Sequence, residues 1–285
     1  MSESICAKLE PMTKRHQAPL SDSYLTPEEA RQAADPSRVR GLSDLRLKII
    51  GYIFIVIGLI GSSMLIPALG SNLRKASISD MSFALLFEAV SWCALPIFAW
   101  LTLDSVRHTS HLGRYALRLL ALALVSEVPY DMSTTGRVWD SGSQSPVWAV
   151  LICVVVLWIF RYYDTRRDWA AWAVRVLTVL AAALDMVLFH IFVRQTLMQG
   201  GLLLLGFVMI FHVLDSHENT MMLAGVVWGM GGLLPPSIGM VFLHYRNGRL
   251  GYRGNRRGGR VRAAFYIGYP AMLLAFGLIR LTLAM

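Results

Sequence analysis

Two carboxylates near position 130 are the residues best suited to do chemistry in this sequence. Glu127 and Asp131 stand four residues apart in an apolar stretch, so a helix presents them on one face. Pro129 lies between them, removes a backbone donor and loosens the turn. Such a pair can orient a substrate amine, hold a histidine, or act as a general base. The alternative is that both lie at a membrane interface and form salt bridges with arginines of neighbouring loops.

A second candidate cluster precedes this pair along the chain. Asp104, His108 and His111 have the spacing i, i+4 and i+7, and share a face if the helix continues through them. Arg107 and Arg114 add positive charge, and arginine suits bidentate contacts to phosphates such as those of coenzyme A. The alternative is a solvated loop that anchors topology. Because no third and fourth ligand stands nearby, we predict no metal site.

The composition places these residues in a membrane protein. Of the 285 residues, 55% are hydrophobic and only 16% are charged, whereas soluble domains are about 25% charged. Apolar runs long enough to cross a bilayer recur from about residue 49 onward. The predicted fold is an all-α polytopic integral membrane protein, a bundle of about eight to nine transmembrane helices. We expect a polar, partly disordered cytoplasmic tail over 1–47 and a transmembrane domain over 48–285.

Charge predicts the orientation. The net charge of +9 comes mainly from arginines, which favour cytoplasmic loops, so we expect a multi-pass protein of the bacterial plasma (inner) membrane with a cytoplasmic N-terminus. The partners expected are membrane lipid and no nucleic acid. The loop 245–262 carries seven arginines and no acid. Eight spans place this loop outside, where so many arginines are unfavourable. We therefore expect a break at Pro235-Pro236 that returns the chain to the cytoplasmic side. The eight apolar segments are 48–69, 81–103, 115–132, 147–163, 169–193, 199–214, 220–243 and 263–284.

Ordered motifs give a resemblance. LPIFA, RHT, YALRLL and SEVPYD follow one another within residues 95–131, and YRNGR and FYIGYP follow near the C-terminus. These blocks resemble the conjugal-transfer TraX family of membrane proteins. The resemblance implies N-terminal acetylation of a protein acceptor such as a pilin, with acetyl-CoA as donor. In these blocks it points to Glu127 and Asp131 as catalytic residues. It points to a donor-binding set of Arg107, His108, Arg114, Arg118, Tyr245 and Asn247.

The sequence departs from the family pattern where chemistry is expected. The Asp-His pair of the family's first helix aligns with Gly58 and Leu59, an expected arginine aligns with Trp92, and an expected histidine aligns with Met272. A histidine held by an aspartate suits deprotonation of an attacking amine, so these losses put the enzyme activity in doubt. The first alternative is a non-catalytic protein that binds a membrane partner or a lipid. A small-molecule transporter is the other, suggested only by the break at Pro235-Pro236.

Overall fold

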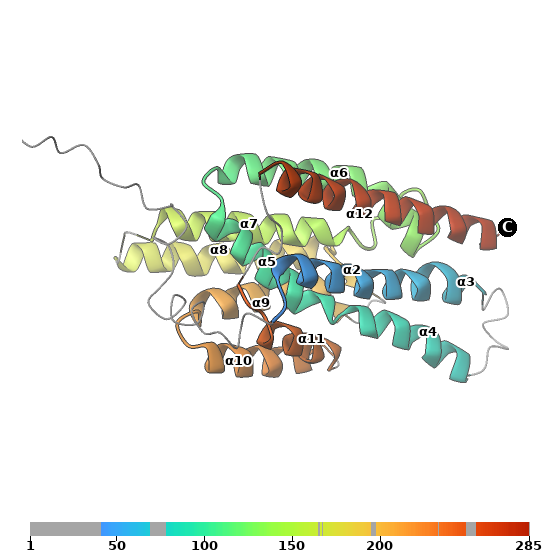
Figure 1. The fold of residues 1–285 in the computed structure, drawn as a ribbon, viewed down its shortest axis with the longest axis horizontal. Coiled ribbons are helices and arrows are strands. Elements are labelled where there is room, and N and C mark those ends of the chain that lie inside the picture. Colours follow the sequence, from blue (N-terminus) through green and yellow to red (C-terminus); the bar gives the residue numbers. More distant parts are fainter. Residues whose placement is uncertain are drawn as a thin grey trace, which may run out of the picture. The chain divides into compact units, whose positions relative to one another are not determined.

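We analysed a computed structural model of the chain (Figure 1). It describes residues 41–68, 78–164, 166, 168–194, 198–232, 234–248 and 255–284. All elements below belong to one unit, Gly41–Met285. Most of the expected polar tail, residues 1–40, lies outside the described residues, as do residues 249–254 of the arginine-rich stretch.

The described part of the chain is almost entirely helical. The one exception is a two-residue antiparallel ladder, in which Val193 pairs with Gln199 and Arg194 pairs with Met198. In chain order the elements are α2 (Asp44–Ile60), a π-helical turn η2 (Gly61–Leu65), α3 (Ile66–Ala68), α4 (Ile78–Ser91), α5 (Ala94–His108), α6 (Leu112–Thr134), α7 (Pro146–Tyr162), α8 (Trp169–Leu188), β1 (Val193–Arg194), β2 (Met198–Gln199), α9 (Gly200–Val213), α10 (Glu218–Met230), α11 (Pro235–His244) and α12 (Asn255–Ala284).

Local sequence signals set several helix starts. Ser43 caps α2 by accepting from the backbone N–H of Arg46, and Asp44 adds a negative charge in the first turn. Ser145 caps α7, where Pro146 occupies the first helical position and needs no donor. Both helices therefore begin at polar residues next to long apolar runs.

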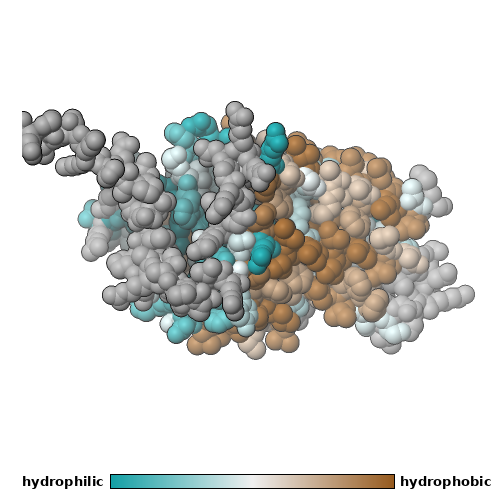
Figure 2. Space-filling model, in the orientation of Figure 1, coloured by the Kyte–Doolittle hydropathy of each residue, from teal (hydrophilic) through white to brown (hydrophobic). Residues whose placement is uncertain are grey.

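Four helical stretches are long and apolar enough to cross a bilayer: Asp44–Ala68, Ser82–His108, Trp169–Leu188 and Gly259–Leu283. Their outer faces are apolar. On α8, for example, Leu177, Leu180 and Leu184 are all more than half exposed. Figure 2 shows hydrophobic residues covering much of one face. These features support a multi-pass membrane protein. The expected count of eight to nine spans is not confirmed, because α7 and α9 are shorter apolar helices and α6 carries four charged residues.

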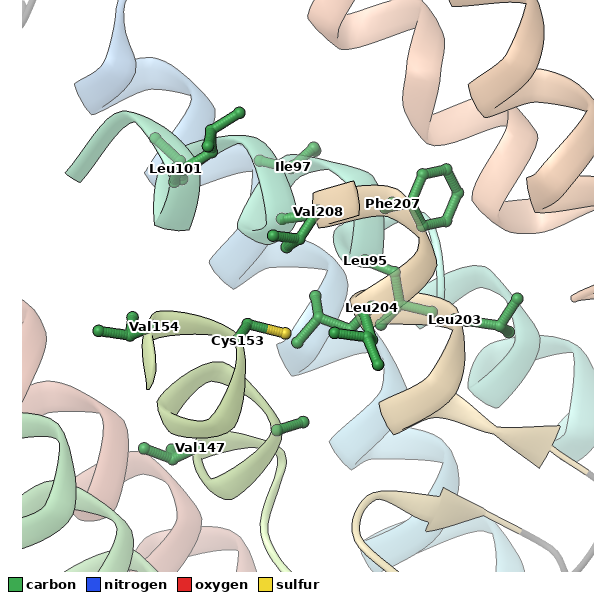
Figure 3. Packing of buried hydrophobic residues seen from close by; sticks show 14 of the residues in the cluster. Leu95, Ile97, Leu101, Val147, Cys153, Val154, Leu203, Leu204, Phe207 and Val208 are labelled. Carbon is green, nitrogen blue, oxygen red and sulfur yellow. The ribbon is translucent and has the colours of Figure 1, made fainter. Parts of the chain in front are cut away.

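The core lies where α5, α7 and α9 meet. Side chains from these three helices interdigitate in Figure 3, with Ile97 on α5, Cys153 on α7 and Phe207 on α9 fully buried. Cys93 and Cys153 are both buried and form no disulfide. They pack as small apolar residues, as their places in apolar helices predict. This core holds α5 in place, and α5 supplies one wall of the site described below.

Contacts between distant loops define two ends of the bundle. At the first, called the proximal end, Leu42 bridges to Arg246 and Arg161 donates to the carbonyl of Thr109 at 3.1 Å. At the second, the distal end, Arg280 donates to the carbonyls of Ser62 and Thr134, the latter at 2.6 Å. The start of α2 is therefore proximal, and the ends of η2 and α12 are distal.

Helices α10 and α11 form a hairpin that begins and ends proximally. Its two ends meet where Arg246 lies 3.3 Å from the Glu218 carboxylate. Its tip, around Pro235, accepts a hydrogen bond of 3.0 Å from the Cys93 thiol, at the turn between α4 and α5. With 13 and 10 residues, the two helices are about 20 and 15 Å long, too short to cross about 30 Å of hydrocarbon.

The break at Pro235-Pro236 thus reverses the chain inside the bundle. Leu234 adopts a positive φ of 72°, and the two prolines then start α11. Spaced glycines allow the close approach of the two arms, because the side chain of Met240 lies over Gly225 and the backbone of Ser237 lies over Gly229. The glycine spacing therefore serves packing within the hairpin.

Candidate functional site

A large cavity lies between α2, α5, α6 and α12. Its volume is about 1170 Å³, above the usual range of about 300–1000 Å³ for small-molecule pockets. It runs along α2 from Asp44 to Leu59, and these residues are fifteen positions apart, or about 22 Å at 1.5 Å per residue. The cavity therefore extends from the proximal end deep into the apolar part of the bundle.

The proximal mouth of the cavity, here called the rim, is charged. Five cationic or titratable side chains line it together with two acids: Lys48, His108, His111, Arg114 and Arg118 with Asp44 and Asp104. The sequence set Asp104, His108 and His111 is thus brought to one place. The sequence did not predict Asp44 and Lys48 as site residues. The signal that could have found them is their position at the start of an apolar span, which places them at one end of the bundle.

His108 and Asp104 form an ion pair within the last turns of α5. Nδ1 of His108 lies 3.2 Å from the Asp104 carboxylate and 2.9 Å from the Asp104 carbonyl oxygen. With Nδ1 engaged, Nε2 is the ring nitrogen left to meet a ligand. The histidine side chain is 64% exposed, so water and solutes reach it at the rim.

Arg114 and Arg118 stand one turn apart on α6 and both line the rim. Both are exposed, and neither has a hydrogen-bond or ion-pair partner among the residues that the structure describes. Two unpaired guanidinium groups one helical turn apart suit a phosphate, which each can contact through two N–H groups. The expectation that they bind an acyl donor stays a prediction.

The floor of the cavity is apolar and partly aromatic. Gly58 and Leu59 come from α2 and Trp92 from the turn after α4, and all three line it. Higher up, Tyr52 packs its ring against Phe98, with the ring centroids 6.1 Å apart. The deepest part of the site therefore offers a ligand apolar contacts, and no acid or histidine of the described residues lines it.

The predicted catalytic carboxylates lie outside this lining. Glu127 accepts from the indole N–H of Trp148 at 2.9 Å and from the backbone N–H of Ser145 at 3.2 Å. Asp131 is 1% exposed and accepts from the backbone N–H of Asp140 at 2.9 Å. Both side chains hold the distal loop between α6 and α7. The geometry gives no support to a role in proton transfer, which stays a prediction.

Three other predicted binding residues also lie away from the cavity lining. Arg107 pairs with Asp215 at 2.8 Å. Asn247 donates its side-chain amide to the carbonyl of Gly41 at 3.0 Å, and the Tyr245 carbonyl accepts from the N–H of Leu42 at 2.7 Å. The YRNGR block thus fastens the start of α2 to the end of the hairpin. These contacts join segments about 200 residues apart, which spacing along the sequence cannot show.

A profile described as TraX protein matches residues 46–280. The chain belongs to the TraX family. Searches of curated proteins and of solved structures found no match. The matched range covers every cavity-lining residue except Asp44.

Membership in TraX gives the floor of the cavity its meaning. Gly58 and Leu59, which align with the expected Asp-His pair, and Trp92, which aligns with the expected arginine, all line it. Met272, at the position where the family resemblance leads us to expect a histidine, packs against the core beside Leu273, which lines the cavity. The positions at which the resemblance leads us to expect other residues are therefore near one another, and the described residues there are apolar.

Proposed function

We propose that this TraX protein binds an acyl donor of the acetyl-CoA type in the cavity. The proposal rests on one observation: the same cavity is charged at one end and apolar at the other. Arg114 and Arg118 line the rim, and the apolar floor lies about 22 Å deeper. An acyl-CoA has the same polarity, with phosphates at one end and an acyl group at the other.

The proposed orientation of the donor follows from this polarity. The phosphates contact Arg114 and Arg118. The narrow arm of the coenzyme runs past Tyr52 through the part of the cavity between rim and floor, here called the shaft. The acyl group then reaches the floor beside Gly58 and Leu59. In this arrangement the acyl carbon arrives where the family's Asp-His pair is expected, which is why the donor-binding function is the one best supported.

Transfer to an amine, such as the N-terminus of a pilin, needs a proton acceptor near that carbon. The floor supplies none, and a missing general base costs on the order of 10²–10⁴ in rate. The Asp104–His108 pair is the titratable pair in the cavity, but it lies at the rim. We therefore propose a donor-binding protein with weak transfer activity.

A non-catalytic relative is the second candidate function. The observation that favours it is the closeness of α2 and α4 at Gly58, where a Cβ atom would lie 2.6 Å from the Cβ of Ser91. The backbone therefore leaves no room for an aspartate at this position. In this reading the cavity holds a ligand that is bound and not converted.

We further propose the orientation of the chain in the bacterial inner membrane. The proximal end carries the rim arginines and the start of the arginine-rich loop, so it faces the cytoplasm. In the described residues seven helical passages connect the two ends, whereas the α10–α11 hairpin begins and ends at the proximal one. Because the hairpin begins and ends at the proximal end, the arginine-rich loop that follows it starts at the same end as α2.

The test is acetyl-CoA binding to the purified protein in detergent, measured by calorimetry. We expect micromolar binding, and we expect the double variant Arg114→Gln/Arg118→Gln to weaken it at least tenfold, since each charge-assisted phosphate contact is worth about 1.5–3 kcal/mol. Arg137→Gln, an exposed arginine after α6 at the distal end, is the matched control and should leave binding unchanged.

No binding of acetyl-CoA at millimolar concentration would overturn the donor-binding proposal. Equal weakening by the distal control would show that net charge, and not the rim, governs the affinity. Acyl transfer to a peptide amine, followed on the same samples, separates the two candidate functions, because only the first allows any transfer.

A further inference from the structure

The wall between α2 and α12 has a hollow on its outer side. A second depression of about 370 Å³ is lined by Leu45, Ala264 and Gly268 and shares Tyr52, Val261 and Phe265 with the main cavity. The two spaces are thus separated at that height by a thin partition.

The residues common to both spaces are Tyr52, Val261 and Phe265, and the first and last of these are in direct contact. The Tyr52 hydroxyl donates to the carbonyl of Phe265 at 2.9 Å, and the two rings lie with centroids 5.0 Å apart. A rotamer change of Tyr52 breaks this hydrogen bond, worth about 1 kcal/mol, and also gives up ring contacts with Phe98 and Tyr269. The partition therefore consists of side-chain contacts, whereas helices pack directly against one another on other sides of the cavity.

The hollow lies on an exposed apolar surface of the kind that faces lipid. Ile49 and Ile53 on α2 and Ile267 on α12 are 45%, 53% and 69% exposed, and all belong to stretches apolar enough to span a bilayer. A solute from water reaches the rim, whereas a molecule at the hollow comes from the bilayer. This side route distinguishes a lipid from a soluble coenzyme.

The shaft also fits a lipid tail. Leu119 and Leu122 on α6 and Leu273 on α12 line it between the rim and the floor. Its length of about 22 Å exceeds the roughly 15 Å that one leaflet, half of a 30 Å hydrocarbon core, requires of a lipid tail. The arm of acetyl-CoA carries amide groups that find few partners on these leucines, whereas an acyl chain is apolar along its whole length and matches the shaft.

We propose that the cavity takes one phospholipid from the proximal leaflet, which enters between α2 and α12. Its phosphate lies on Arg114 and Arg118, and an acyl chain fills the shaft down to Leu59. The inference extends the proposed function without requiring acyl transfer. Phospholipid and acyl-CoA share a phosphate and an acyl chain, so the two compete for the rim.

The experiment adds palmitoyl-oleoyl phosphatidylglycerol or phosphatidylethanolamine to delipidated protein in detergent. Native mass spectrometry then counts retained lipids. We expect one lipid to persist on the unaltered protein. Leu122→Trp, which blocks the shaft below the rim, should reduce its retention at least tenfold. Leu124→Trp is the matched control, because Leu124 lies two residues away on the same helix and is 60% exposed.

A second variant tests the entry route independently, in case Leu122→Trp does not fold. A Cβ added at Gly268 meets no atom within 4 Å, so Gly268→Leu fills the outer hollow without a clash. We expect slower lipid loading in this variant and unchanged acetyl-CoA affinity. Equal lipid retention in the unaltered protein, Leu122→Trp and Leu124→Trp would mean that the lipid is held on the outer surface, and would overturn the inference.

Measuring acetyl-CoA affinity on the same samples separates this inference from the proposed function. Acetyl-CoA binding with no retained lipid overturns the lipid site and leaves the donor-binding function standing. Retained lipid that Leu122→Trp removes, without acetyl-CoA binding, supports the lipid site and overturns donor binding. Displacement of the lipid by palmitoyl-CoA but not by coenzyme A supports a shared shaft that selects for the acyl chain.

Discussion

Gly58 lies at a close contact between α2 and α4. Its neighbour across the helix contact is Ser91, whose Cβ and Oγ would lie 2.6 and 2.7 Å from a Cβ added at Gly58. An aspartate needs far more room than that. Placing an aspartate at position 58 therefore requires changes on both α2 and α4.

The cost of a side chain at Gly58 is measurable with the smallest change. We expect Gly58→Ala to lower the free energy of unfolding by about 1–3 kcal/mol, because overpacking outweighs the gain in helix propensity. Gly268→Ala, which meets no neighbour, should raise it by up to about 1 kcal/mol. Denaturation midpoints in detergent give both values. A rescue of Gly58→Ala by Ser91→Gly is expected, and its absence would contradict the steric account.

Glu127 makes contacts that anchor the loop after α6. We expect Glu127→Ala to lower the free energy of unfolding by about 1–3 kcal/mol, because the partly buried Trp148 indole and the Ser145 backbone lose their acceptor. Glu127→Gln keeps an acceptor oxygen and should cost less. Acetyl-CoA affinity should stay unchanged in both. Loss of acyl transfer in Glu127→Gln with an unchanged unfolding midpoint would instead identify a general base.

Spacing along the sequence predicted some of these residues and missed others. The i, i+4 relation of Asp104 and His108 exists within one helix, and the structure shows it. Glu127 and Asp131 share a helix too, but their partners, Ser145 and Asp140, come from the loop that follows. Contacts of that kind depend on how the chain folds back, so the local pattern suggested a reaction where the structure shows loop anchoring.

At the scale of elements, the apolar segments of the sequence correspond closely to the helices. The proline pair at 235–236 correctly indicated a break. The turn at Trp92 and Cys93 was not expected, although the sequence holds a local signal for it. Pro96 cannot donate to the carbonyl of Trp92 four residues earlier, and its ring clashes with that carbonyl in a continuous helix. The hairpin tip then packs at the break, where the carbonyl of Pro235 accepts from the Cys93 thiol. A continuous apolar run therefore reads as one span although the helix is interrupted.

The hairpin has a direct test by labelling. In a background without native cysteines, Ser216→Cys before α10 and Tyr245→Cys after α11 should react with a membrane-impermeant maleimide from the same side. Val138→Cys in the distal loop should react from the opposite side; Tyr245 and Val138 are 61% and 62% exposed. Reaction of positions 216 and 245 from opposite sides would mean that the segment crosses the membrane.

For the whole molecule, composition predicted the class and motifs predicted the family. Neither located the cavity, because its lining comes from helices far apart in the sequence and its polar and apolar parts are mixed along each helix. The count of spans was also beyond reach. Hydropathy does not distinguish a complete passage from a hairpin of two short helices, since both present the same apolar composition.

The contacts of Arg280 have a consequence for biosynthesis. This arginine lies near the end of α12, and it donates to carbonyls of Ser62, at the end of the first passage, and of Thr134, at the end of α6. The first and third passages are inserted long before α12 is translated. Until then one wall of the cavity is missing, and the polar turn after α2 faces lipid or the insertion machinery. The cavity is thus a late product of assembly, and a chain that stalls before α12 has most of its helices but lacks one wall of the site.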